Sequence, residues 1–286
     1  YKVCLTHHDG YRGGQLFTYC GIDATEKAET FARAALQRGR QALDASNSPD
    51  FTETSIEILG SESQFGANRK SSPAREVCVK IAVRHPEAHG VATFLKEATG
   101  LALAAPPGLS GFAGTRPRPS PVLALFSFLL SKDRVSARIE DAAGNAIIPL
   151  QGASTLQPAE RPVPPAPSAA NAEMVEVDLL RVCWARSGDK GDNANIGVIA
   201  RRPEFMPYIW ATLDEATVTR LFAHFLRGEV LRYHLPGLHA MNIVLTQVLG
   251  GGGTSSLRND PQGKGYAQIL LAHRIRVPKS LLKETR

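Results

Sequence analysis

The sequence predicts an α/β fold, in which a partial α/β sandwich domain (residues 1–150) is followed by a small α+β domain (residues 174–286). Three observations predict this organisation. In the first part, strand-like apolar runs alternate with segments of helical spacing, as in layered α/β domains. Residues 151–173 are rich in Pro, Ala and Ser, a composition typical of an extended linker. Strand patterning then restarts at Val175.

The first elements follow from local periodicity. Residues 1–6 read as a strand that ends in a polar loop at residues 7–15. Residues 24–43 place apolar side chains three or four positions apart, which predicts an amphipathic helix. Residues 52–59 alternate polar and apolar side chains, which predicts a strand.

Two further helices are expected before the domain ends in strands. Ser72-Pro73 is a good helix start, so we expect a helix from there to about Val83. Another helix is expected from near Pro86 to about Ala104, where Pro and Gly residues end it. The continuous apolar run Val122–Leu130 predicts a strand covered on both faces, and residues 135–140 predict a second strand.

The second domain mixes strands with helix. Residues 175–184 read as a strand that leads into a polar loop at residues 185–193. The other expected elements are a strand at 195–201, a helix at about 214–226, and strands at 230–234, 240–248 and 266–277.

Composition excludes several classes of protein. The 286 residues are 43% hydrophobic and 21% charged, as in globular proteins. The longest apolar runs fall well short of the roughly 20 residues of a membrane span, so no membrane partner is expected. The formal charge of +6 is scattered without a basic cluster, so no nucleic-acid partner is expected either.

Four cysteines, Cys4, Cys20, Cys78 and Cys183, lack the paired spacing of a zinc site or a disulfide framework. We expect free thiols, with Cys4, Cys78 and Cys183 buried, in a reducing compartment: the cytoplasm, or the mitochondrial matrix in a eukaryote. Because Tyr1 begins in the middle of a strand pattern, we expect the chain to be a piece of a longer protein.

The segment A-R-S-G-D-K-G-D-N-A-N at residues 185–195 carries the densest polar chemistry. Its candidate substrate-binding residues are Ser187, Asp189, Lys190, Asp192 and Asn193. Together they supply acceptors, a cation and an amide for holding a polar ligand. The competing interpretation is a turn rich in Asp and Asn whose side chains bond the backbone.

His8, Asp9 and Glu62 are the candidate catalytic residues, because each follows a predicted strand. One imidazole could act as a general base oriented by Asp9, and Glu62 could act as a base or an acceptor. The alternatives are a turn capped by His8 and Asp9, and a solvated acid at Glu62. No spacing supports a metal site, so none is expected.

Arg116 and Arg118 follow a glycine-rich loop that contains Gly108, Gly111 and Gly114. Glycine amides and arginine forks suit a phosphate or a carboxylate, so both arginines are candidate substrate-binding residues. A rigid Pro-rich cover over the sheet is the competing interpretation.

Four motifs occur in one order: T-H-H-D-G-Y-R-G-G-Q (6–15), E-S-Q-F-G (62–66), P-P-G-L-S-G-F-A-G-T-R-P-R-P-S-P (106–121) and the polar segment at 185–201. In this the chain resembles the acyclic terpene utilisation (AtuA-like) family over nearly its whole length. The resemblance implies the C-terminal part of the family's large α/β domain, followed by a ferredoxin-like α+β domain. It also implies an absent N-terminal portion as a partner of this chain.

The resemblance further implies breakdown of branched or isoprenoid acids through CoA thioesters, with a small-molecule acid or CoA ester as ligand. We expect a lyase, hydratase or hydrolase whose site lies between the first domain and the polar segment 187–193. The cofactor is unknown, and a homo-oligomer is expected. The alternative is a non-catalytic scaffold or interaction subunit of an acyl-CoA catabolic complex. Convergence of the polar loops on one cavity would favour the enzyme, and dispersal would favour the scaffold.

Overall fold

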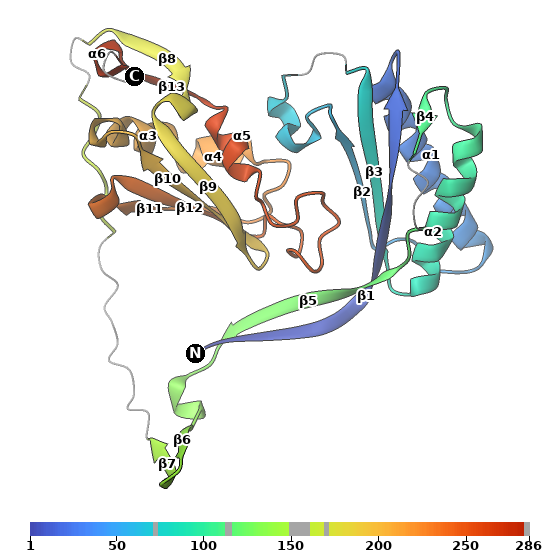
Figure 1. Ribbon diagram of the computed structural model, residues 1–286, viewed down its shortest axis with the longest axis horizontal. Coiled ribbons are helices and arrows are strands. Elements are labelled where there is room, and N and C mark those ends of the chain that lie inside the picture. The colour runs from blue at the N-terminus through green and yellow to red at the C-terminus, as the bar shows by residue number, and fades with distance from the viewer. Residues whose placement is uncertain (71–73, 112–115, 149–160, 169–171, 283–286) are drawn as a thin grey trace.

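The computed structural model describes residues 1–70, 74–111, 116–148, 161–168 and 172–282. Its elements form two units, each with its own hydrophobic core (Figure 1). The first unit runs from strand β1 to strand β5, and the second from strand β8 to helix α6. The mixed α/β fold class predicted from the sequence is confirmed.

The first unit is built on one antiparallel sheet with the order β2-β3-β1-β4, and β5 also pairs with β1. The strands are β1 (Lys2–Cys20), β2 (Glu53–Leu59), β3 (Glu76–His85), β4 (Leu109–Ser110) and β5 (Ser120–Leu129).

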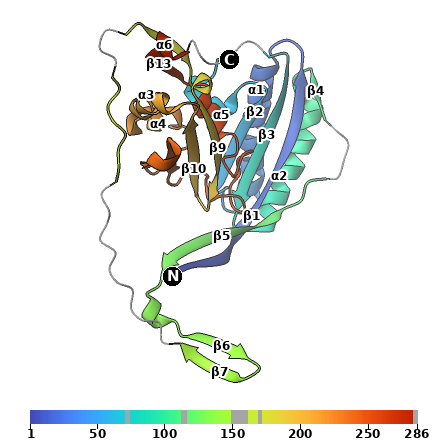
Figure 2. The ribbon, with the colours of Figure 1, turned by 60° about the vertical axis from the view of Figure 1, so that its left-hand side comes forward.

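Two helices, α1 (Ala24–Ala45) and α2 (Ala88–Leu101), cover one face of this sheet, and both match predicted helices. The apolar side of α1 packs Phe31 and Leu36 against strand residues such as Phe17. The other face of the sheet turns toward the second unit (Figure 2). The first unit is therefore two layers, and no helix of this unit covers the other face of the sheet in the described part of the chain.

The helix expected from Ser72 to Val83 is wrong, because residues 76–85 form β3; Ser72 and Pro73 lie outside the described residues. Val77, Val79, Ile81 and Val83 are buried, whereas Cys78, Lys80 and Arg84 at intervening positions are half-buried; Ala82 is also buried. This two-residue period is that of a strand with one covered face. The β-branched side chains also favour a strand over a helix.

The polar loop expected at residues 7–15 is also wrong, because β1 continues through it with a bulge between His8 and Tyr11. Beyond the bulge, residues 2–8 pair with residues 123–129 as a projecting two-stranded ribbon, here called the β1–β5 ribbon. Burial on both faces of the Val122–Leu130 run is wrong: Phe126 is 57% exposed and Leu129 is 84% exposed.

The second unit has a four-stranded antiparallel sheet with the order β11-β12-β10-β9. Its strands are β9 (Cys183–Lys190), β10 (Asn193–Ala200), β11 (Val230–Leu235) and β12 (Ala240–Leu245). Beside it, β8 (Met174–Asp178) pairs with β13 (Arg274–Pro278). The helices are α3 (Met206–Thr212), α4 (Glu215–Leu221), α5 (Tyr266–Leu271) and α6 (Lys279–Leu282).

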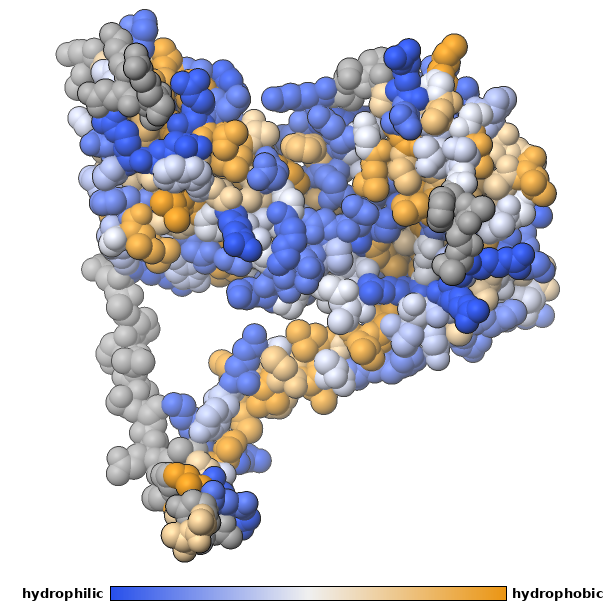
Figure 3. All heavy atoms as spheres, viewed as in Figure 1, coloured by the Kyte–Doolittle hydropathy of each residue, from blue (hydrophilic) through white to orange (hydrophobic). Residues whose placement is uncertain are grey.

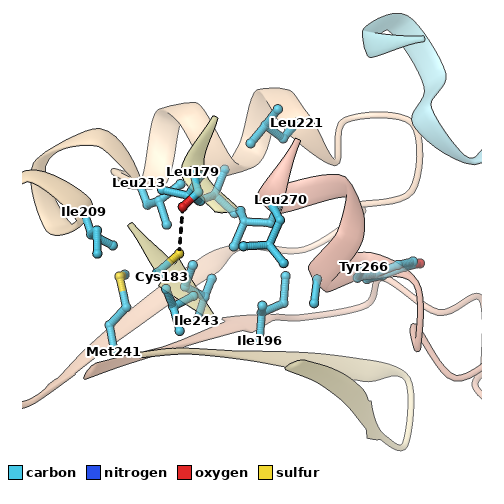
Figure 4. Packing of buried hydrophobic residues seen from close by; sticks show 14 of the residues in the cluster. Leu179, Cys183, Ile196, Ile209, Leu213, Leu221, Met241, Ile243, Tyr266 and Leu270 are labelled. Atoms are coloured by element: carbon cyan, nitrogen blue, oxygen red, sulfur yellow. Dashed lines mark hydrogen bonds between the residues drawn. The ribbon is translucent and has the colours of Figure 1, made fainter. Parts of the chain in front are cut away.

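The core of the second unit lies between its four-stranded sheet and these helices (Figure 4). Ile196 and Ile243 from the sheet meet Leu213 and Leu270 from the helical layer. The Cys183 thiol lies within this core and donates to the Leu179 carbonyl oxygen at 3.4 Å. Burial raises the pKa of Cys183 to about 12.

Three predictions for the second unit need correction. The strand expected at 175–184 is divided by a short turn into β8 and β9. The strand expected at 266–277 is instead α5 followed by β13. The predicted loop at 185–193 is largely the hairpin of β9 and β10, so its polar side chains sit on strands.

The remaining short elements join these layers. A two-stranded hairpin of β6 (Ala137–Asp141) and β7 (Gly144–Ile148) follows the β1–β5 ribbon. The 3-10 helices are η1 (Ser63–Asn68), η2 (Ala102–Ala104), η3 (Lys132–Arg134), η4 (Leu179–Arg181), η5 (Pro203–Phe205) and η6 (Pro236–Leu238).

Residues 161–168 of the predicted linker form neither helix nor strand, and they pack on the second unit. Pro164 is buried, and the Tyr208 hydroxyl donates to the Ser168 carbonyl oxygen at 2.9 Å. The Arg161 guanidinium lies 4.7 Å from the centre of the Tyr233 ring. The domain boundary at 151–173 stays a prediction.

All four cysteines are free thiols. The expected burial holds for Cys183 alone, since Cys78 is half-buried and Cys4 is exposed on the β1–β5 ribbon. Within the described part of the chain, no helix is long and apolar enough to cross a membrane.

Candidate functional site

A large cavity, about 890 Å³, lies between the uncovered face of the first sheet and the loop at residues 249–261 of the second unit, here called the docking loop. Figure 3 shows the two units meeting along this line, with hydrophilic side chains gathered there. Its size is within the range of roughly 300–1,000 Å³ typical of small-molecule sites. The lining includes the strand residues Gly14, Thr18, Cys78 and Lys80 and the docking-loop residues Ser256, Leu257 and Asn259.

Four cationic residues line this cavity, namely Arg12, Lys80, Arg118 and Arg258, and no carboxylate residue is among the described residues that line it. Arg258 is held by the second unit, since it donates to the Val248 and Phe225 carbonyl oxygens. Arg118 is exposed at the mouth. The cavity therefore favours an anionic ligand.

Arg12 reaches from β1 to the docking loop, where it donates to the carbonyl oxygens of Ser256 and, at 3.4 Å, Gly253. Burial, and then the nearby charge on Arg84, lowers the pKa of Arg12. Within the described part of the chain, Arg12 donates hydrogen bonds only to neutral carbonyl oxygens.

Lys80 and Glu57 form a buried ion pair across β3 and β2, with 2.7 Å between Nζ and Oε2. Their side chains are 17% and 9% exposed. Lys80 also donates to the Leu257 carbonyl oxygen, and the Asn259 backbone N–H donates to Glu57 at 2.7 Å. The pair thus fastens the docking loop to the first sheet.

A second contact between the units joins η1 to the segment after α4. The His224 Nε2 donates to the Gln64 carbonyl oxygen at 2.9 Å. Gly66 has φ 54°, and a Cβ at that position would lie 2.5 Å from the His224 ring. Burial lowers the pKa of His224, so the neutral imidazole is favoured in the folded protein.

Three predicted binding residues of the β9–β10 hairpin contact the docking loop or the residues that flank it. Asp192 Oδ1 accepts from the Gly251 N–H at 2.6 Å, and Asn193 Oδ1 accepts from the Gln247 N–H at 3.0 Å. The buried Ser187 hydroxyl donates to the Gly263 carbonyl oxygen at 2.6 Å. None of these three residues is among the described residues that line the cavity.

The other two hairpin candidates are more exposed. Asp189 pairs with Lys264 at 3.2 Å, and this hydrogen bond lowers the pKa of Asp189. Lys190 is exposed at the end of β9. Neither residue is among the described residues that line the large cavity, and their predicted contact with a substrate stays a prediction.

His8 and Asp9 line a separate hollow of about 420 Å³ near the bulge in β1. The exposed His8 ring meets Tyr11 edge-on, with 5.0 Å between ring centres. Asp9 forms an ion pair with Arg84. Asp9 therefore bonds an arginine of the sheet instead of orienting an imidazole.

Glu62 lines a third hollow of about 300 Å³, together with His273. Its backbone is left-handed, with φ 52°, and its carboxylate accepts from the Lys70 N–H at 2.5 Å. Of the two predicted arginines, Arg118 lines the large cavity and Arg116 does not, although both are exposed.

Of the candidate residues named from the sequence, His8, Asp9, Glu62 and Arg118 are thus divided among three hollows, and the others line none of these hollows. A different set of residues converges on the large cavity. Sequence reasoning missed Arg12, Lys80 and Glu57. The available signal was a charge inside an apolar strand pattern, I-E-I at residues 56–58 and V-K-I at residues 79–81. In the described part of the chain, no group of three or more His, Cys, Asp or Glu side chains is placed to hold a metal ion.

Two family models match the chain. The model described as acyclic terpene utilisation family protein AtuA matches residues 1–140, and the model described as AtuA ferredoxin-like domain matches residues 177–276. No curated protein and no solved structure matches the chain.

Proposed function

The chain belongs to the acyclic terpene utilisation (AtuA) family, and from this premise we propose that its large cavity binds a branched or isoprenoid acid, free or as a CoA ester. The observation that carries the proposal is the lining of that cavity. Arg12, Lys80 and Arg118 lie on one wall, and no described lining residue is acidic. Such a site complements a carboxylate or the phosphates of CoA.

We further propose that the protein catalyses a lyase, hydratase or hydrolase step on this ligand. Each of these reactions on an acyl thioester develops negative charge at the carbonyl oxygen or the neighbouring carbon. Donors fixed before the reaction stabilise that charge. The Lys80 ammonium, oriented by Glu57 at 2.7 Å, supplies such a donor at the cavity wall.

The test is ligand binding to matched arginine variants. Isothermal titration with geranic acid, coenzyme A and geranoyl-CoA should show binding to the wild-type protein. Arg118→Met should weaken binding about tenfold, because one charge-assisted contact is lost. Arg116→Met removes an equally exposed arginine two residues away that does not line the cavity, so it should leave the affinity unchanged.

Binding should be followed by incubation of the acyl-CoA with the protein and mass spectrometry of the products. A new hydrated, cleaved or hydrolysed species is the expected result. Absence of binding for all three compounds would contradict the proposed function. Equal losses for Arg118→Met and Arg116→Met would place the ligand outside the cavity.

A second candidate role, as an interaction subunit, is favoured by the β1–β5 ribbon. Leu5, Phe126 and Phe128 are each at least 40% exposed there. Leu5 and Phe126 are directly paired across the two strands, so their side chains share one face. An exposed apolar face of this kind is typical of a protein interaction surface.

A further inference from the structure

Arg12 and Arg84 lie opposite each other on the same face of the sheet, but their hydrogen-bond partners differ in charge. Arg84 pairs with the carboxylates of Asp9 and Glu53. Arg12 is half-buried and donates to the carbonyl oxygens of Gly253 and Ser256. A half-buried charge that is solvated only by neutral groups lacks the partner that would best stabilise it.

The two carbonyl groups come from the tip of the docking loop, while the base of the loop is held elsewhere. Asp192 fixes the Gly251 N–H, and Arg258 fixes the Val248 carbonyl oxygen. Gly250, Gly251 and Gly252, at and beside this anchor, all have positive φ. At the tip, the Thr254 hydroxyl donates to the Leu123 carbonyl oxygen at 2.7 Å, and Ser255 and Ser256 are buried. Movement of the tip at the glycine segment therefore requires release of the Thr254 contact as well as of Arg12.

We propose that the Arg12 guanidinium is the subsite for the ligand's oxyanion, and that the Gly253 and Ser256 carbonyl oxygens occupy this subsite until a ligand displaces them. The inference rests on the proposed function and adds where the anionic group binds and what it must displace. A carboxylate or a phosphate presents two oxygens to the guanidinium fork, which matches the two acceptors now in place.

Lys80 has a different part in this arrangement. Its charge is already compensated by Glu57, and the pair holds Leu257 and Asn259 on the far side of the loop tip. Release of the carbonyl groups from Arg12 therefore leaves that second attachment in place. Ligand binding is expected to loosen residues 253–256 without separating the two units.

The experiment is hydrogen–deuterium exchange of the docking-loop peptide combined with calorimetric titration. The probes are geranic acid as the carboxylate source, coenzyme A as the phosphate source, and pantetheine as a neutral fragment of coenzyme A. The variants are Arg12→Met and Arg12→Lys. The control is Arg138→Met, which replaces an exposed arginine on β6, away from the cavity.

In the wild-type protein, the oxyanion probe that binds should speed amide exchange in the loop tip, and pantetheine should not. Arg12→Met should exchange fast in the tip without any probe, and should bind the oxyanion at least about tenfold more weakly. Arg12→Lys keeps the positive charge but loses the two-pronged guanidinium group. Its affinity for the oxyanion should therefore lie between those of the wild-type protein and Arg12→Met. Arg138→Met should match the wild type.

Two results would overturn the inference alone: unchanged affinity in both Arg12 variants, or slower exchange in the loop tip on binding. If no oxyanion probe binds the wild-type protein, the proposed function fails together with the inference. Circular dichroism melts of each variant establish that the Arg12 proteins are folded when they are measured. If Arg12→Met does not fold, the affinity and amide exchange of Arg12→Lys test the inference instead.

Discussion

At the scale of single residues, Gly66 is a position where the two units pack closely together. Its φ of 54° and ψ of −126° belong to a conformation reserved for glycine. The absent Cβ also leaves room for the His224 ring. Because Gly66 has no side chain, the His224 ring can come close enough to donate its hydrogen bond to the Gln64 carbonyl oxygen.

Gly66→Ala should lower the free energy of unfolding by about 1–3 kcal/mol, because the new methyl group is strained and meets the imidazole. The matched control is Gly100→Ala in α2, where nothing lies within 4 Å of the added Cβ. That substitution should raise stability by about 0.5–1 kcal/mol. Urea denaturation measures both changes, and equal effects would contradict the role given to Gly66.

The β9–β10 hairpin shows how far single residues could be read from the sequence. Its excess of polar side chains was visible, and both interpretations required acceptors at Asp192 and Asn193. Their partners, Gly251 and Gln247, lie more than 50 positions away in the chain. A local sequence pattern carries no information about partners so far away in the chain. The sequence alone therefore could not decide whether these side chains bind a ligand or support a loop.

At the scale of elements, two errors have different physical causes. Helix α5 was expected as a strand because its start carries no capping residue of its own. Its first turn is capped from another strand, since the Ala267 N–H donates to the Ser187 hydroxyl at 2.9 Å. By contrast, β3 was expected as a helix because the local Ser72-Pro73 signal outweighed the two-residue period that follows it. Helices α1 and α2, whose signals are local, were predicted correctly.

The attachment of the docking loop to β2 and β3 gives a second prediction. Lys80→Met should cost about 3 kcal/mol of stability, because it leaves the Glu57 carboxylate buried without its counter-charge. The double variant Glu57→Gln, Lys80→Met should recover much of this loss, since no buried charge remains. Denaturation curves of the single and double variants provide the test. A double variant less stable than Lys80→Met would contradict the buried-charge argument.

At the scale of the whole molecule, the two cores are joined by polar contacts and by Phe65 of the first unit, which packs against the core of the second. The linker composition predicted the presence of two units but not that residues 161–168 pack on the second one. Pro164 and the Tyr208 contact to Ser168 fix that segment. A proline-rich segment has little conformational freedom to lose, so few contacts suffice to hold it.

Limited proteolysis with elastase should therefore give an N-terminal fragment and a C-terminal fragment that keeps residues 161–168. Tyr208→Phe removes the hydroxyl donor to Ser168 and should make this segment easier to cleave. Mass spectrometry of the fragments identifies the cleavage sites. First cleavage within residues 161–168 of the wild-type protein would contradict the packing described above.

We expect the β1–β5 ribbon to influence how the protein behaves in concentrated solution. In the described part of the chain β5 pairs only with β1, so one edge of a strand rich in Leu and Phe has no strand partner. Such an edge is a template for growth by addition of further strands. Because this growth depends on chain concentration and needs no ligand, we expect the ribbon to limit the solubility of the protein whether or not the cavity is occupied.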